Sequence, residues 1–204
     1  MTLSEFDNEI RKDHNVVCGC DEAGRGPLAG DVFAAAVIFD KDTVIEGIND
    51  SKKLTAKKRD ELFDEIMEKA VDFSIQTATV EEIEDINILN AAMLAMKRAV
   101  EDMDTKPDVC LIDGNKTPEG LECPAIAVVK GDAKSQAVAA ASILAKVARD
   151  RYMEQMAEQY PEYRFEKHKG YGTKLHYQMI DQYGPCGIHR MSFLKKYYAK
   201  KNGH

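Results

Sequence analysis

Residues 16–27 read VVCGCDEAGRGP and decide the fold of this chain. The apolar first half predicts a buried strand from Val16 to Asp21, and the Gly-Arg-Gly-Pro run predicts a tight turn directly after it. Two adjacent carboxylates, Asp21 and Glu22, lie at the junction. A strand end that feeds a glycine-rich turn can hold carboxylates and exposed backbone N–H groups side by side. This junction is therefore the first candidate for a site that binds metal and phosphate together.

Outward from this stretch, strand-like and helix-like periods alternate along the chain. Short apolar runs predict further strands at 31–39, 72–80, 109–113 and 125–129, and amphipathic runs predict helices at 55–70, 81–103 and 134–159. The first two strands are separated only by the Gly and Pro turn, which favours a hairpin. This alternation predicts a mixed α/β layer structure.

Two further acids stand at predicted element boundaries. Asp113 ends an apolar strand before Gly114, and Asp132 lies between a strand and the long helix that follows. Neighbouring strands can deliver such side chains to one edge of a sheet. Because successive strand residues point to opposite faces, Asp21 and Glu22 can converge on one ion only if the strand ends between them.

Each of these acids also has an ordinary explanation. Asp132 could be a helix N-cap that accepts a hydrogen bond from the amide of Lys134 or Ser135. Asp113 before Gly114 could be a turn residue, and Asp21 and Glu22 could be exposed loop acids. The coincidence of all four acids at strand ends favours a shared site.

Composition and charge bound the function. The 204 residues, 44% apolar, fit one domain. No apolar stretch approaches the roughly 18 to 20 residues of a membrane span, and a polar N-terminus predicts a soluble, cytoplasmic protein.

The net charge is −7, yet residues 164–204 carry +7 and the remainder −14. This separation of charge along the chain suits an enzyme with an acidic cleft for cations and a basic flank for a polyanion. The alternative explanation of the basic segment is a solvated tail. Five cysteines, an odd number without a second metal-spaced pair, predict reduced core thiols.

Several ordered motifs resemble one enzyme family. Bacterial ribonuclease HII, the type 2 ribonuclease H, resembles this chain from about residue 16 to 194. The motifs that carry the resemblance are GCDEAGRGPLAG (19–30), DSKKL (50–54), DGN (113–115), KGDAKS (130–135), AASILAK (140–146), HKGYGT (168–173) and HRMSF (189–193).

The resemblance implies a ribonuclease H-like fold: a mixed five-stranded sheet flanked by helices, with a small helical C-terminal lobe. It divides one structural domain into a catalytic core, 1–163, and a basic lobe packed on it, 164–204. It implies a monomer that acts on RNA–DNA hybrids and on single ribonucleotides embedded in duplex DNA. Cleavage on the 5′ side of the RNA–DNA junction would leave a 5′-phosphate and a 3′-hydroxyl.

The resemblance also implies the roles of individual residues. Four acids would bind two divalent ions, Mg²⁺ or Mn²⁺, and match Asp21, Glu22, Asp113 and Asp132. The Gly24-Arg25-Gly26 element would contact the ribonucleotide and its 2′-hydroxyl, and Tyr171 would stack on the sugar of the following deoxynucleotide. Additional substrate contacts are predicted at Lys52, Arg190 and Ser192.

Elementary chemistry supports this set of ligands. Two metals about 3.5 to 4 Å apart can activate a water and neutralise the leaving oxygen of a phosphodiester. We expect Asp21 to be the ligand shared by both ions. A proofreading-type exonuclease is a rival, but its first two acids are separated by one residue, whereas Asp21 and Glu22 are adjacent. A nonenzymatic phosphate-binding module is the second rival, and the loop lacks the Gly-Lys-Ser/Thr ending of a P-loop.

Overall fold

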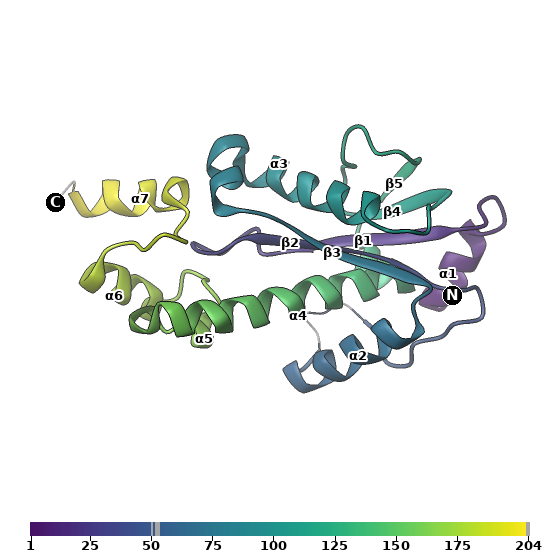
Figure 1. The fold of residues 1–204 in the computed structure, drawn as a ribbon, viewed down its shortest axis with the longest axis horizontal. Coiled ribbons are helices and arrows are strands. Elements are labelled where there is room, and N and C mark those ends of the chain that lie inside the picture. Colours follow the sequence, from purple (N-terminus) through teal and green to yellow (C-terminus); the bar gives the residue numbers. More distant parts are fainter. Residues whose placement is uncertain (50, 52–53, 203–204) are drawn as a thin grey trace.

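The computed structural model describes residues 1–49, 51 and 54–202 and has a five-stranded mixed sheet at its centre (Figure 1). The strands are β1 (Val17–Ala23), β2 (Val32–Ile38), β3 (Asp72–Ala78), β4 (Val109–Asp113) and β5 (Ala125–Val128). Their order across the sheet is β3-β2-β1-β4-β5, with β1 antiparallel to β2 and parallel to β4. The predicted hairpin and the predicted fold class are confirmed.

Helices cover both faces of this sheet. Four pack on it or beside it: α1 (Leu3–Ile10), α2 (Ala56–Lys69), α3 (Val80–Glu101) and α4 (Gln136–Gln159). Figure 1 shows α3 on one face and α4 on the other, with α2 on the outer side of α4. The short helix η3 (Pro161–Tyr163) leads into the C-terminal lobe. The lobe contains α5 (Phe165–His168), α6 (Lys174–Tyr183) and α7 (Met191–Asn202), and it lies beyond the end of the sheet toward which β1 runs.

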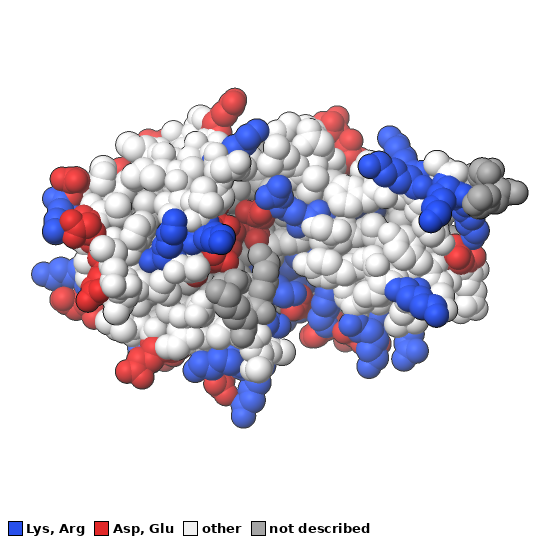
Figure 2. Space-filling model, turned by 180° about the vertical axis from the view of Figure 1, so that it is seen from behind, with Lys and Arg blue, Asp and Glu red and all other residues white. Residues whose placement is uncertain are grey.

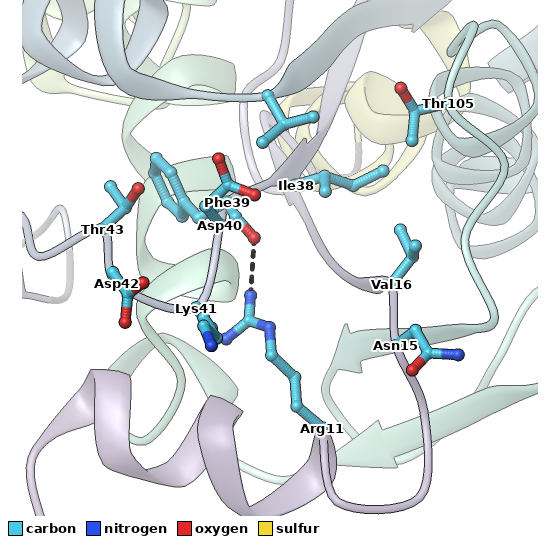
Figure 3. Close-up of a pocket in the computed structure, with 11 residues that line it drawn as sticks. Arg11, Asn15, Val16, Ile38, Phe39, Asp40, Lys41, Asp42, Thr43 and Thr105 are labelled. Atoms are coloured by element: carbon cyan, nitrogen blue, oxygen red, sulfur yellow. Dashed lines mark hydrogen bonds between the residues drawn. The ribbon is translucent and has the colours of Figure 1, made fainter.

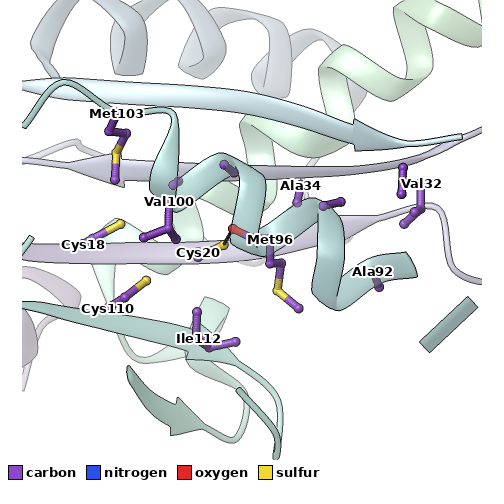
Figure 4. Packing of buried hydrophobic residues seen from close by; sticks show 14 of the residues in the cluster. Cys18, Cys20, Val32, Ala34, Ala92, Met96, Val100, Met103, Cys110 and Ile112 are labelled. Atoms are coloured by element: carbon purple, nitrogen blue, oxygen red, sulfur yellow. Dashed lines mark hydrogen bonds between the residues drawn. The ribbon is translucent and has the colours of Figure 1, made fainter. Parts of the chain in front are cut away.

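The two faces of β1 meet different layers. Cys18 and Cys20 face α3 and pack with Met96 in an apolar cluster (Figure 4). Gly19 faces α4 so closely that an added Cβ would lie 2.2 Å from the carbonyl carbon of Ala137. The long helix therefore runs directly along β1, from Gly19 toward the Gly-Arg-Gly turn. All five cysteines are free thiols, as predicted, and no helix in the described ranges is long and apolar enough to cross a membrane.

Three details differ from the sequence-based expectation. Helix α1 was not predicted, although Thr2 and Glu5 form a capping box at its start. Helix α3 matches the predicted range 81–103 to within two residues at each end but is kinked at Asn87, where φ is +67°. The Asn87 side chain accepts hydrogen bonds from the amides of Leu89 and Asn90, so it caps a new helical segment inside α3. The third difference is the length of β1, which bears on the acids described next.

Candidate active site

Adjacent parallel strands bring Asp21 and Asp113 together. The paired register of β1 and β4 ends at Cys20 and Ile112, and the two aspartates are the next residues on their strands. Side chains at odd-numbered positions of the two strands, such as Val17 on β1 and Leu111 on β4, pack on the α4 side of the sheet. By alternation, Asp21 and Asp113 are on that same side. The predicted convergence of these two acids at one sheet edge is confirmed.

Asp21 is held in an unfavourable electrostatic position. Its side chain is only 5% exposed. Burial raises its pKa well above the usual value, and the charges of Glu22 and Asp113 raise it further, while a hydrogen bond with Ser142 of α4 opposes them. The neighbouring carboxylates therefore repel each other in a site with little water, and a bound cation would relieve this repulsion.

Asp132 belongs to a turn that is tied to Asp113. The turn is the 3₁₀ helix η2 (Gly131–Ala133), and the amide of Gly131 donates to Oδ1 of Asp113 at 2.7 Å. Asp132 is buried and directly follows this amide. The alternative role of Asp132 as the N-cap of the long helix is wrong: Ser135 caps α4, and the amides of Lys134 and Ser135 donate to the Gly131 carbonyl.

Glu22 does not share the face of Asp21. The expectation that the strand ends between the two acids is wrong, because β1 pairs with β2 as far as Ala23. Alternation then places Glu22 on the α3 side, where its carboxylate accepts a hydrogen bond from Arg25 at 3.1 Å. The two adjacent acids flank the end of the strand from opposite sides, so a metal bound by both would lie at the sheet edge.

A hollow of about 530 Å³ opens beside Glu22. Its walls come from the Gly-Arg-Gly turn, from α3, from α4 and from the lobe, and include Arg25, Ser51, Ile88, Ser142, Lys146, Tyr171 and Phe193. Tyr171 is 42% exposed, and the amino group of Lys146 lies 5.9 Å from the centre of its ring. Figure 2 shows acidic side chains in the central part of the face that it draws, with Lys and Arg side chains beside them.

A second hollow lies at the opposite end of β1 and β2. It has about 600 Å³ and is lined by residues that include Arg11, Asn15, Phe39 and Thr105 (Figure 3). Arg11 donates to the Phe39 carbonyl at 2.8 Å across it. None of the four predicted acids lines this hollow, so volume alone does not identify the site.

Two buried arginines hold the Gly-Arg-Gly turn in place. Arg190 is fully buried, and its guanidinium donates to the carbonyls of Gly24, Arg25, Pro27 and Gly30 at 2.7 to 3.2 Å. Arg149 of α4 donates to the carbonyls of Ala29, Asp31 and Lys169. The sequence does not reveal the role of Arg149, because its helical neighbours give no sign of partners more than a hundred positions away.

The structure places the predicted substrate contacts in different environments. The expectation that Arg190 contacts the substrate is wrong, because its guanidinium is buried and donates to four backbone carbonyls. Ser192 lies at the start of α7, where its hydroxyl donates to Glu84 of α3 at 2.7 Å. Lys52 lies outside the described residues. Gly24, Arg25, Gly26 and Tyr171 all line the hollow beside Glu22, and their roles stay predictions.

The donor set at the sheet edge suits a hard divalent cation. Carboxylate oxygens are the groups that Mg²⁺ and Mn²⁺ prefer, and the thiols of Cys18 and Cys20 are buried in the apolar cluster under α3. Within residues 1–49, 51 and 54–202, no three His, Cys, Asp or Glu side chains stand in a preformed metal-binding group. Asp21, Glu22 and Asp113 accept hydrogen bonds from the amide of Glu22, from Arg25 and from the amide of Gly131, respectively.

Comparison with known proteins points to one family. The family model described as Ribonuclease HII matches residues 18–196. The ribonuclease HII of Caldicellulosiruptor saccharolyticus is 54% identical over 189 residues, which cover 93% of this chain and 92% of that protein. The crystal structure of the ribonuclease H2 from Pyrococcus horikoshii OT3 matches with a TM-score of 0.72 at 29% identity, over 87% of this chain and 93% of that one. Bst-RNase HIII in complex with Mn²⁺ shares the fold, with a TM-score of 0.66 at 18% identity over 83% and 63%.

Proposed function

Because this chain belongs to the ribonuclease HII family, we propose that it cuts the RNA strand of RNA–DNA hybrids and single ribonucleotides embedded in duplex DNA. The chain is an enzyme of a metal-dependent nuclease family, and ribonuclease H action on RNA–DNA hybrids follows from that membership. The position of the cut, 5′ to the junction, and the products, a 5′-phosphate and a 3′-hydroxyl, are part of the proposal. Its monomeric state and cytoplasmic location stay predictions.

One observation carries this proposal. Asp21 and Asp113 meet at the end of β1 and β4, next to a hollow that also contains the Gly-Arg-Gly turn and Tyr171. Glu22, the backbone of the Gly-Arg-Gly turn and the Tyr171 ring line this one hollow, and Asp21 directly precedes Glu22 on β1. A purely structural cluster of acids would not require the other two elements beside it.

Asp21, Glu22, Asp113 and Asp132 would hold the two divalent ions, Mg²⁺ or Mn²⁺. When bound, such ions lower the pKa of a water and stabilise the charge on the leaving oxygen. The protein's own contribution is to place the carboxylates at the sheet edge. Asp21 is fixed by β1 and Ser142, and Asp113 is fixed by the amide of Gly131.

The Gly-Arg-Gly turn would read the ribose. The guanidinium of Arg190 holds the carbonyls of Gly24 and Arg25 inward, which leaves the opposite side of their peptide units facing the hollow. Gly26 carries no side chain, and the nearest atom to an added Cβ would be in the Tyr171 ring at 3.8 Å. Backbone groups can therefore approach a 2′-hydroxyl, the group by which proteins distinguish RNA from DNA.

Tyr171 would stack on the sugar of the next nucleotide. Its ring borders the same hollow as Gly26 and has the cationic groups of Lys146 and Arg149 each 5.9 Å from its centre. These positive charges favour a phosphate beside the stacked sugar. A ribonucleotide followed by a deoxynucleotide would thus contact the turn and the tyrosine in succession.

A duplex with one internal ribonucleotide tests the proposal. We expect a single nick on the 5′ side of the ribonucleotide that requires Mg²⁺ or Mn²⁺ and leaves a 3′-hydroxyl that a polymerase can extend. The same ribonucleotide placed in a closed circular duplex should also be cut, because no strand end is needed. Cutting only from ends would support the exonuclease alternative, and tight binding without any cut in either metal would support a binding module.

A further inference from the structure

We propose that a single turn, Cys186–Arg190, positions both elements that read the substrate. Within it, His189 sets Tyr171 and Arg190 sets the Gly-Arg-Gly turn, so both are positioning residues that do not touch the substrate. The inference rests on the proposed function, because it concerns how the ribose-reading and junction-reading elements are held at a fixed separation. Three sets of contacts carry it.

The first set is a chain of hydrogen bonds with a defined direction. The amide of Cys186 donates to Nδ1 of His189 at 2.9 Å, so this ring carries its proton on Nε2. That nitrogen lies 3.0 Å from Nε2 of His176 and must donate to it, which leaves the His176 proton on Nδ1, 3.0 Å from the carbonyl of Tyr171. This relay of hydrogen bonds, from Cys186 through His189 and His176, thus ends on the backbone of Tyr171.

Burial keeps this relay neutral. His176 is 0% and His189 3% exposed, and burial, the largest cause, lowers the pKa of each ring to about 4. His168 stacks on His176 with ring centres 4.4 Å apart, and its Nδ1 accepts from the amide of Gly170. The amide of Gly170 and the carbonyl of Tyr171 are therefore both held by histidines.

The second set starts at the residue after His189. Arg190 makes four hydrogen bonds to carbonyls between Gly24 and Gly30. No ion pair involves Arg190 among the residues that the structure describes, so its donors serve the turn. Because His189 and Arg190 are consecutive, a shift of either one would move the other by a similar distance.

The third set ties the backbones together. Ala29 and His189 form an isolated bridge, the amide of Gly30 donates to Ile188, and the amide of Arg190 donates to Leu28. The amide of Leu28 in turn donates to the carbonyl of Gly170, next to Tyr171. The Gly-Arg-Gly turn, the Tyr171 loop and the turn Cys186–Arg190 are therefore one connected unit.

A fixed separation has a functional consequence. A junction is read correctly only when the ribose-reading turn and the stacking ring are one nucleotide apart. A misplacement of about 1 Å in a reacting complex can cost about 10²-fold in rate. The rigid turn would therefore determine how strongly the enzyme prefers an embedded ribonucleotide over a uniform hybrid.

A double-mutant cycle of His189 and Tyr171 tests the proposal. The measured quantity is the ratio of kcat/KM on a duplex with one embedded ribonucleotide to kcat/KM on a uniform RNA–DNA hybrid. We expect His189→Phe, which removes both ring hydrogen bonds, to lower this ratio about tenfold, within the range that misplaced groups show. In a Tyr171→Ala background the same substitution should leave the ratio unchanged, since His189 acts through Tyr171.

Controls separate positioning from general damage. His189→Gln can donate to His176 again and should restore part of the ratio. The smaller loss that remains in His189→Gln should vanish in the Tyr171→Ala background, and this cycle replaces the first one if the Phe variant does not fold. His14→Phe, the same substitution outside the relay, should not change the ratio. Arg190→Lys should lower cleavage of both substrates, because the turn reads a ribose in each.

The outcomes are distinct. A ratio that His189→Phe leaves unchanged, or that falls by the same factor with and without the Tyr171 side chain, would overturn the proposal. Failure of the unmodified enzyme to cut an embedded ribonucleotide would instead overturn the proposed function.

Discussion

The buried acids at the end of β1 and β4 and the buried polar cluster of the C-terminal lobe differ in how their charges are balanced. At the end of β1 and β4, Asp21 lies near two other carboxylates, and its pKa is raised by burial and by their charges. In the C-terminal lobe, His176, His189 and Arg190 have their donors directed at ring nitrogens or carbonyls. Their pKa values are lowered, mainly by burial, to about 4 for the histidines and about 9 for Arg190.

The difference indicates what each cluster is for. A buried hydrogen-bonded network that is satisfied within the protein gives rigidity, so the lobe needs no ligand to be complete. A group of repelling carboxylates costs stability unless a cation joins it. On the proposed function, bound cations would stabilise the acids, and the lobe would hold the elements that contact the substrate.

The largest effect should come from Asp113→Asn. Loss of a metal ligand should reduce turnover by several orders of magnitude in Mg²⁺ or Mn²⁺. Folding should be intact, and the thermal midpoint without metal should be equal or higher, because one source of repulsion on Asp21 is gone. Turnover on an RNA–DNA hybrid and a melting curve in EDTA measure the two parts.

A control for this substitution is Asp108→Asn. Asp108 is also beside β4, but at its start, where it accepts a hydrogen bond from the amide of Val16. This variant should keep its turnover. Near-normal turnover of Asp113→Asn, or a marked loss of stability in the absence of metal, would contradict the contrast between the clusters.

The next largest effect should come from Gly24→Ala, at the point where the two clusters meet. Gly24 has φ +103°, and an added Cβ would lie 2.2 Å from Nε of Arg149. Backbone strain and the collision should together cost about 2 to 5 kcal/mol of folding free energy. Urea unfolding measures this loss, and cleavage should fall with it because the turn is displaced.

Gly184→Ala separates strain from collision. Gly184 has φ +77°, but nothing lies within 4 Å of an added Cβ. It should lose only about 1 to 2 kcal/mol, the strain alone. Equal losses at the two glycines would show that the Arg149 contact does not restrict the turn.

A smaller effect is expected for Tyr171→Ala. Loss of a stacking platform is typically worth about 1 to 3 kcal/mol, so cleavage at a single embedded ribonucleotide should fall by about tenfold or somewhat more. The ring is partly exposed, and melting should change little. Tyr183→Ala, which removes an exposed tyrosine of the same lobe, is the control. Unchanged rates for Tyr171→Ala would remove this residue from the site.

The sequence predicts one cluster far better than the other. Each acid follows or precedes an apolar run and a glycine, so local pattern alone places Asp21, Asp113 and Asp132 at element boundaries. The extension of β1 to Ala23 was not visible, because strand length depends on pairing with β2. Local pattern could also have revealed α1, through the Thr2 and Glu5 capping box.

The lobe could not be predicted in the same way. The partners of Arg190 lie 160 to 166 positions away, and those of Arg149 include Ala29, 120 positions away. From the sequence alone, Arg190 is expected on the surface, where it could contact the substrate, because arginine is usually exposed. Only the tertiary fold shows that it is buried. Glu84 and Ser192 meet for the same reason.

The smallest effect concerns acid pH, where the two clusters should act with opposite signs. The pKa of His176 and of His189 is about 4 in the folded chain and about 6.5 when unfolded. Their stabilising contribution is thus complete above pH 6.5 and is lost as the pH falls toward 4. Between pH 7 and 6 this loss should be about 0.5 to 1 kcal/mol for each ring.

Asp21 should oppose this loss, because its raised pKa means that the folded chain takes up a proton before the unfolded chain does. Urea unfolding without metal at pH 7, 6 and 5 should therefore show a steeper acid loss for Asp21→Asn than for the unchanged chain. The unfolding free energy of His189→Phe, taken relative to its own value at pH 7, should fall less with acid than that of the unchanged chain. Parallel pH curves for the three proteins would contradict this opposition of the two clusters. Each variant removes a titrating group from only one of them, so the curves should diverge.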